Sequence, residues 1–369
     1  MQIPNWPIAG DRELELLRVV LESSQWGGFH PLVAAFEQQF AALQNTKHCI
    51  SAMNGTVTLE VLLQAAGIGP GDEVIVPAIS FVATATAVSR IGATPVFVDI
   101  EEYSFNLCPD RTAAAITPKT KAIIVVHFGG PLANMDSLVP LAASNKLLLI
   151  EDAAHAQASD WRGQRAGSFG WASSFSFQNG KVLTAGEGGA MLTNSDEVAA
   201  QLRCLCNIGR KAGENFFNHY EIGTNARISA FQAAVLIAQL ERLPEQIALR
   251  SRNAARLIAA TAERKGLTWQ HVPQQVTAHS WYLMLGRINE AEFGESRNQL
   301  HARLAAKGVP CTPFYPHTLY QNPVYASGGC RVEPCPNSEA CVGDAFWFPH
   351  RLLMSDEATI DEVAAILTA

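Results

Sequence analysis

The sequence predicts an α/β fold, in which helices flank a mainly parallel β-sheet and a smaller α+β unit follows. Apolar runs alternate with helix-like stretches from about residue 46 to residue 195. The runs are continuously apolar, as in VIV at 74–76 and IIVV at 123–126, which is typical of strands buried on both faces. Hydrophobic residues make up 48% of the chain and charged residues 17%, which is enough to form a large core.

The first part of the chain repeats strand, helix, strand. An amino-terminal helix is expected at about 11–23 and packs back on one of the two units. The expected strands are 47–53, 72–78, 94–100, 121–127 and 146–152. The expected helices between them are 56–66, 81–92 and 135–145, followed by a helix at 196–209 and a polar, aromatic loop at 210–227. This order predicts parallel strands joined by helical crossovers.

The remainder of the chain predicts a second, smaller unit. Its expected elements are helices at 229–243 and 246–265, a strand at 280–288, a helix at 295–307, a proline-rich crossing at 309–323 and a helix after Asp356. We therefore expect a large domain over residues 1–245, which includes the amino-terminal helix, and a small carboxy-terminal domain over residues 246–369.

Composition excludes several classes of protein. The net charge of −7 without a basic cluster argues against a nucleic-acid partner. The first residues lack the basic start and apolar run of a signal peptide, and no run reaches the roughly 20 apolar residues that span a bilayer. We expect a cytoplasmic protein without a membrane partner. Cys330, Cys335 and Cys341 precede His350, but their spacing matches no common zinc pattern, so no metal is expected.

Polar residues follow several of the apolar runs, where ligands bind in open parallel sheets. Asn54, Gly55 and Thr56 follow the first strand and open a helix, which suits a phosphate group, although an ordinary helix cap is the alternative. Phe81 follows the second strand, where its ring either covers a flat ligand or joins the core.

Two further strands end in ionisable residues. Asp152 and His155 follow the strand at 146–152, and one helical turn would place both on the same side. A carboxylate at the end of a buried strand is costly unless a cation pairs with it. Lys181 follows FSFQNG and precedes Gly186, Gly188 and Gly189. A phosphate-binding site, a stacking ring, a buried carboxylate and a lysine together predict pyridoxal 5′-phosphate (PLP). Its aldehyde needs an amine, and its ring nitrogen needs an anion.

Four longer segments resemble a known family. PAISFVATATAVSRIGATPVFVDI, EDAAHAQAS, FSFQNGKVLTAGEGGAMLT and IGTNARISAFQAAVLIAQLERL are similar to segments of the DegT/StrS-type sugar aminotransferases. The likeness runs from Trp26 to about Leu353. It implies PLP fold type I, the aspartate-aminotransferase-like fold, and a homodimer whose subunits share each active site.

The resemblance also implies residue roles. Lys181 is the expected Schiff-base lysine and proton shuttle, Asp152 the partner of the ring nitrogen, and His155 the residue against one ring face. Gly55, Thr56 and Ser176 would hold the phosphate, with Asn225 reaching it from the partner subunit. Arg227 and His350 are expected substrate contacts or structural residues. The pocket wall is expected to draw on residues 26–30, 209–220 and 311–350.

The expected reaction moves an amino group from glutamate or glutamine to a keto-cyclitol or keto-sugar by a ping-pong mechanism. SFQNGK, CPNSEA and FWFPHRLLM resemble the scyllo-inosose aminotransferases and the 3-amino-5-hydroxybenzoate synthases. A PLP-dependent dehydratase and aromatase of the second kind is therefore one alternative. A PLP- and sugar-binding regulator without turnover is another, although such a protein needs neither Lys181 nor Asp152.

Overall fold

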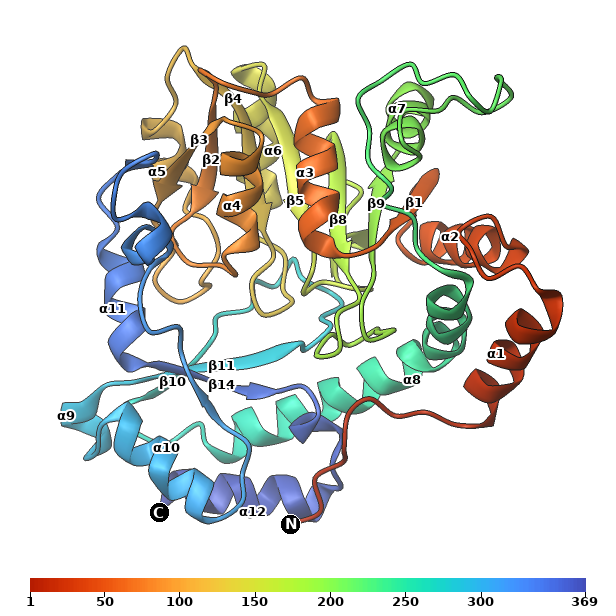
Figure 1. The fold of residues 1–369 in the computed structure, drawn as a ribbon. Helices are drawn as coiled ribbons and strands as arrows, with labels where there is room; N and C mark the ends of the chain where they lie inside the picture. Colours follow the sequence, from red (N-terminus) through yellow and green to blue (C-terminus); the bar gives the residue numbers. More distant parts are fainter.

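A computed structural model describes residues 1–369, and its centre is an eight-stranded sheet (Figure 1). In spatial order the strands are β1 (His48–Ala52), β9 (Gly189–Thr193), β8 (Ala172–Ser176), β5 (Leu148–Asp152), β4 (Thr120–Val126), β2 (Glu73–Pro77), β3 (Thr94–Val98) and β13 (Arg331–Val332). Only β9 runs antiparallel to its neighbours, β1 and β8. All other pairs are parallel, which confirms the predicted sheet.

Helices cover both faces of this sheet, and each face carries its own apolar core. The first core contains residues of α1 (Asp11–Ser23), α2 (Pro31–Leu43), α6 (Met135–Ser144) and α8 (Ala230–Ala260). The second contains residues of α3 (Gly55–Ala65), α4 (Ala83–Arg90) and α7 (Asp196–Cys206). Successive residues of a strand point to opposite faces of the sheet and so belong to one core or the other, which explains why strands such as β2 and β4 are apolar at consecutive positions.

The carboxy-terminal part forms a four-stranded sheet below the large one (Figure 1). Its order is β10 (Leu267–Trp269), β11 (Leu283–Ile288), β14 (Ala345–Pro349) and β12 (Thr312–Pro313). The remaining elements are α5 (Pro109–Ala114), β6 (Asp160–Trp161), β7 (Gln164–Arg165), α9 (Glu290–Phe293), α10 (Arg297–Ala306), α11 (Pro336–Asp344), α12 (Glu357–Thr368) and the 3₁₀ helices Leu319–Gln321, Pro323–Tyr325 and Leu352–Met354.

The helices differ from the prediction in several places: the short helices α5, α9 and α11 were not predicted, and two larger differences concern α8 and α2. The two helices expected at 229–243 and 246–265 are one helix, α8, in which Pro244 lies inside. A proline removes one helical N–H, but the buried side chains of Leu243 and Gln246 on either side hold the helix against the core. Helix α2 was not predicted, although Pro31 at its first turn and the His30 side chain as its cap are sequence signals for a helix start. The domain division near residue 245 stays a prediction.

A further apolar cluster joins the two sheets at the carboxyl ends of the central strands. It contains Ile79 after β2 and Phe128 after β4, packed with Leu283 and Leu285 of β11 and with Phe314. The carboxyl ends of the strands therefore face the smaller sheet, so that a site at this edge has walls from both parts of the chain. None of the helices is long and apolar enough to cross a membrane.

Candidate active site

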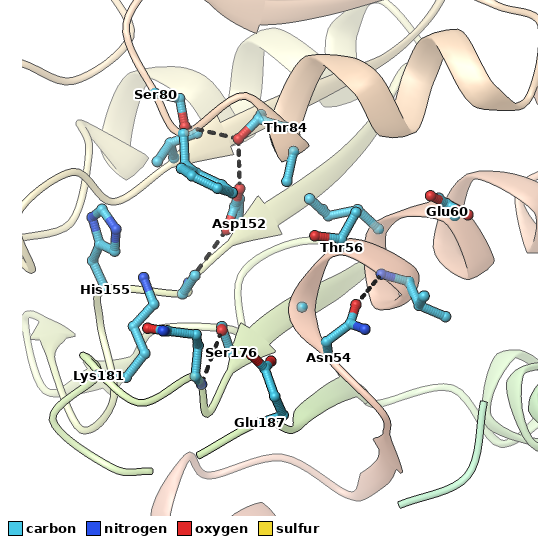
Figure 2. A pocket seen from close by; sticks show the side chains of 18 of the residues that line it. Asn54, Thr56, Glu60, Ser80, Thr84, Asp152, His155, Ser176, Lys181 and Glu187 are labelled. Atoms are coloured by element: carbon cyan, nitrogen blue, oxygen red, sulfur yellow. Dashed lines mark hydrogen bonds between the residues drawn. The ribbon is translucent and has the colours of Figure 1, made fainter. Parts of the chain in front are cut away.

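A cavity of about 750 Å³ lies at this edge (Figure 2). The strand ends and following loops supply most of the side chains that line it. They include Asn54, Gly55, Thr56, Ser80, Phe81, Thr84, Asp152, His155, Ser176, Gln178 and Lys181. Tyr282 and Tyr315 line it from the carboxy-terminal part. The structure thus brings together eight of the predicted residues in one cavity.

One end of the cavity is formed by the start of α3. The Asn54 side chain caps the helix by accepting a hydrogen bond of 2.9 Å from the Val57 N–H. The N–H groups of Gly55 and Thr56 have no acceptor within the protein. A Cβ atom at Gly55 would lie 2.9 Å from Cβ of Ser176, so glycine is needed for the helix start to approach β8. Two free amides, the helix dipole and the nearby Ser176 hydroxyl suit a phosphate group.

Asp152 ends β5 and lies buried in the cavity wall. Its carboxylate accepts a 2.8 Å hydrogen bond from the Thr84 hydroxyl and a 3.3 Å bond from the Ala154 N–H. Thr84 is in turn 2.8 Å from the Ser80 hydroxyl (Figure 2). No cation forms an ion pair with Asp152, and burial raises the pKa of its carboxyl group. A positively charged group opposite this carboxylate would offset the cost of burial.

Lys181 projects into the same cavity from the loop after β8. The side chain is 9% exposed, and its ammonium group forms no ion pair or hydrogen bond within the protein. It lies 4.3 Å from the centre of the Tyr282 ring. A buried amine without an acidic partner is free to react with a bound carbonyl group.

His155 lies in the turn after β5, not in a helix, because the chain closes with a hydrogen bond from the Ala156 N–H to the Ala153 carbonyl. Its ring packs against Tyr282 with the ring centres 4.3 Å apart. The Gly129 N–H donates to its Nδ1 atom at 3.3 Å, which places the proton of the neutral ring on Nε2. Burial lowers the pKa of His155 well below its ordinary value, so the ring is neutral.

Three predicted residues lie outside the lining of this cavity. Asn225 is exposed in the loop before α8. Arg227 donates to the Asn207 side chain at 2.7 Å and faces the Phe29 ring. His350 is buried, and its Nε2 atom lies 3.1 Å from the Gly180 carbonyl oxygen. Of the wall expected from residues 26–30, 209–220 and 311–350, only Tyr315 lines the cavity of this chain.

The sequence reasoning missed Thr84, Gln178, Tyr282 and Tyr315. Thr84 lies on the first turn of α4, and its spacing from Ser80 was a possible signal for a hydroxyl pair facing the site. Gln178 belongs to the quoted SFQNGK segment, but no pattern around it indicated a place in the cavity wall. The tyrosines carry no such signal, because they lie on and beside the second sheet, whose docking no local pattern reveals.

The cavity fits PLP on the grounds of its chemistry. Free amides at a helix start accept a phosphate, the uncompensated Asp152 suits a protonated ring nitrogen, and the unpaired Lys181 amine suits an aldehyde. Phe81 is 59% exposed at the rim and His155 lies inside, so that aromatic groups are available on a flat ligand's faces. These needs are met by the side chains of one cavity.

Nearly the whole length of the chain matches one family of known proteins. Residues 7–368 match the DegT/DnrJ/EryC1/StrS aminotransferase family. The 3-amino-5-hydroxybenzoate synthase of Amycolatopsis mediterranei is 37% identical over 99% of this chain and 96% of its own. The L-glutamine:2-deoxy-scyllo-inosose aminotransferase of Streptoalloteichus tenebrarius is 36% identical, over 98% and 92%.

Solved structures support the same family assignment. A crystal structure of 3-amino-5-hydroxybenzoic acid synthase superposes with a TM-score of 0.94 at 36% identity, over 100% of this chain and 98% of that one. The GDP-4-keto-6-deoxy-D-mannose-3-dehydratase of E. coli, with bound hydrated PLP, gives a TM-score of 0.89 at 25% identity, over 99% and 100%. The fold is therefore PLP fold type I, and the chain belongs to the DegT/DnrJ/EryC1/StrS family of PLP-dependent aminotransferases.

Proposed function

We propose that this protein transfers an amino group from glutamate or glutamine to the ketone of a cyclitol or sugar, in two half-reactions at one site. The observation that carries this proposal is that one cavity contains both a buried Lys181 amine and a buried Asp152 carboxylate, and that neither group forms an ion pair. A site built only to bind a sugar needs neither group.

Each residue has a defined task. PLP supplies an aldehyde that bonds to amines and a ring that withdraws electrons when its nitrogen is protonated. Asp152 holds the proton on that nitrogen, and the Thr84 hydroxyl and Ala154 N–H fix the carboxylate's orientation. The Gly55 and Thr56 amides bind the phosphate, with Ser176 beside them. His155 and Phe81 also line the cavity and would offer aromatic contacts to the flat ring.

Lys181 moves the proton during the reaction. With a substrate bound, its free amine would remove a proton from the substrate carbon and return one to a neighbouring atom. The same lysine serves both half-reactions, since donor and acceptor enter one cavity in turn. This order predicts ping-pong kinetics.

The substrate class is argued from the relatives. One is named for glutamine as donor and a scyllo-inosose as acceptor. The cavity of about 750 Å³ offers room for a six-membered polyol beside the cofactor, and the Gln178, Tyr282 and Tyr315 side chains offer polar contacts to hydroxyl groups. We therefore favour a keto-cyclitol over a nucleotide-linked sugar as the acceptor.

A second candidate function is the dehydration and aromatisation of an aminoshikimate-type substrate. The similarity to 3-amino-5-hydroxybenzoate synthase in both sequence and structure favours it. The same lysine would remove a proton from a substrate carbon next to the one that carries the amine, and a substrate hydroxyl group would leave as water. Incubation with an aminoshikimate-like substrate, followed by ultraviolet detection of an aromatic product, separates this function from transamination.

The central test is spectroscopic. Protein reconstituted with PLP should be yellow, and addition of glutamine or glutamate should bleach the colour. Addition of scyllo-inosose should then restore the colour and give an amino-cyclitol detectable by mass spectrometry. A protein that remains yellow with every amine contradicts the proposal and indicates a regulator that binds without turnover.

We also propose that the active protein is a homodimer. The loop before α8 exposes Phe216, Phe217 and Ile222, with 60%, 82% and 91% of their surface accessible in the single chain. Asn225 follows them and lies outside its own chain's cavity. An exposed apolar loop is suited to contact with a second copy of the chain. Asn225, whose side chain has no hydrogen-bond partner in its own chain, would then enter the cavity of that copy.

Subunit mixing tests the shared site. Lys181→Ala and Asn225→Ala dimers should each be weak. When they are mixed and allowed to exchange, activity should rise to about a quarter of wild type, because half of the dimers are mixed and each has one intact site. No gain on mixing, in a sample shown to exchange subunits, contradicts a site shared through Asn225.

A further inference from the structure

The first ten residues form a strap across the loop that carries Lys181. At its start, the Met1 amino group lies 3.5 Å from the Glu362 carboxylate, and Arg351 donates to the Pro4 carbonyl at 3.3 Å. At its end, the Ile8 carbonyl accepts a 2.7 Å hydrogen bond from Gln239 of α8. The strap is therefore held to the carboxy-terminal part at its start and to the first half of α8 at its end, and it runs from beside α12 past α8 to α1 (Figure 1).

Trp6 lies in the middle of the strap and binds the main chain of the lysine. Its indole N–H donates to the Lys181 carbonyl oxygen at 3.1 Å. The Nε2 atom of His350 lies 3.1 Å from the neighbouring Gly180 carbonyl oxygen, and because a carbonyl only accepts, Nε2 carries the proton. The two rings touch edge to face, with centres 4.4 Å apart and an interplanar angle of 89°.

The amides of the same two residues are also bonded. The Gly180 N–H donates to the Gln178 side-chain oxygen at 2.8 Å, and the Lys181 N–H donates to the Gln178 carbonyl at 2.8 Å. All four main-chain polar groups of Gly180 and Lys181 are thus occupied. The Lys181 side chain, by contrast, has no hydrogen bond or ion pair.

We propose that Trp6 and His350 are positioning residues, which fix the main chain of Gly180 and Lys181 so that the lysine side chain pivots from a constant point. Lys181 must reach the cofactor and, when released, a substrate carbon, and rates of such steps depend on placement within about 1 Å. Trp6 and His350 come from opposite ends of the chain and contact the reaction only through Lys181. This inference rests on the role proposed for Lys181.

The alternative is that both rings merely fill space between the strap and the small sheet. Packing alone does not require donors aimed at two successive carbonyl groups. Trp6→Phe separates the two cases, since it keeps an aromatic ring against His350 and removes the N–H. Trp269→Phe is the matched control, because Trp269 also donates one indole hydrogen bond, of 2.9 Å to Thr261, but lies in the carboxy-terminal core away from the cavity.

Trp6→Phe should lower kcat about three- to tenfold, the effect of one lost hydrogen bond, while KM for donor and acceptor changes by less than about twofold. In the apoprotein, the amides of residues 178–184 should exchange with deuterium several times faster than in wild type. Trp269→Phe should reduce thermal stability to a similar extent and change neither kcat nor this exchange. Unchanged kcat and exchange in folded Trp6→Phe would overturn the proposal.

His350 gives a second, independent test. His350→Gln keeps a side-chain N–H that can reach the Gly180 carbonyl, whereas His350→Phe keeps a ring without a donor. We expect His350→Phe to slow covalent attachment of PLP to Lys181 and His350→Gln to restore most of the rate. Equal rates in the two variants would overturn the proposal. Attachment and exchange need no amino acceptor, so these results stand apart from any failure of the proposed transamination.

Discussion

The cavity has two walls that differ in origin and in chemistry. The strand-end wall (Gly55, Thr56, Asp152, Ser176 and Lys181) comes from segments that each follow or precede a strand of one sheet. The carboxy-terminal wall is Tyr282 and Tyr315, which are brought in by the docking of the second sheet. The first wall carries the reactive groups, and the second carries neutral aromatic side chains. This difference predicts that the strand-end wall determines the rate of the chemical steps, and that the carboxy-terminal wall determines which acceptor is bound.

The largest effect is expected at Lys181. Lys181→Ala should lower turnover by at least about a thousandfold, since it removes both the amine for PLP and the group that moves the proton. Peptide mass spectrometry after borohydride reduction should show PLP on residue 181 in wild type and none in the variant. Lys181→Arg, which keeps the charge, should be equally inactive, and significant turnover in either variant contradicts the assignment.

The second-largest effect is expected at the carboxylate of Asp152. Asp152→Asn should lower kcat about a hundred- to a thousandfold, because a neutral amide cannot hold the proton on the cofactor nitrogen. The matched control is Asp99→Asn, at another buried carboxylate, which accepts hydrogen bonds from Ser338 at the start of α11 and does not line the cavity. Asp99→Asn should reduce stability and leave kcat unchanged. Normal turnover in Asp152→Asn would show that Asp152 is merely structural.

Acid should destabilise the protein through its buried histidines. Burial lowers the pKa of His350 and of His279 to about 3 each, and lowers that of His155 well below its ordinary value. Between about pH 6.5 and 3 the unfolded chain binds protons that the native state does not. His350 and His279 therefore each lower the unfolding free energy by on the order of 1 kcal/mol per pH unit as the pH falls through this window, and His155 acts in the same direction.

Urea unfolding at pH 7, 6 and 5 measures this loss. His350→Gln should reduce the slope by the contribution of one histidine. Stability that is constant or rises from pH 7 to pH 5 contradicts the prediction. The result would also show how much of the acid sensitivity belongs to the carboxy-terminal part, which supplies His279 and His350.

The smallest effect is expected on the carboxy-terminal wall. Tyr315 has a raised pKa because of burial, so its hydroxyl stays protonated, and it has no hydrogen-bond partner within the protein. Tyr315→Phe should raise KM for the acceptor about three- to tenfold with little change in kcat, through loss of one hydrogen bond to a substrate hydroxyl. Tyr325→Phe, whose hydroxyl lies 3.2 Å from Ser89 outside the cavity, is the control. A large fall in kcat with unchanged KM would place Tyr315 in the chemistry instead.

The strand-end wall was predictable because parallel strands bring their carboxyl ends to one edge of a sheet. Asp152 and Lys181 could therefore be placed together from the order of apolar runs and the residues that follow them. The helical segments around residues 230–260 were predicted, but their continuity was not, because Pro244 normally signals a break and only the packing of its neighbours overrides that signal. His350 could be singled out from the sequence, but not its contact with the Gly180 carbonyl.

The sequence alone determined the parallel sheet, the family and the set of polar residues at the strand ends, because these depend on local patterns of burial and on short motifs. Only the tertiary structure decided which side chains close the cavity and which groups fix Lys181. Trp6, Tyr282 and His350 meet around that lysine from positions 175, 101 and 169 residues away along the chain, and such contacts depend on the docking of two sheets. No local pattern encodes that docking, since many surfaces of equal hydrophobicity would satisfy it.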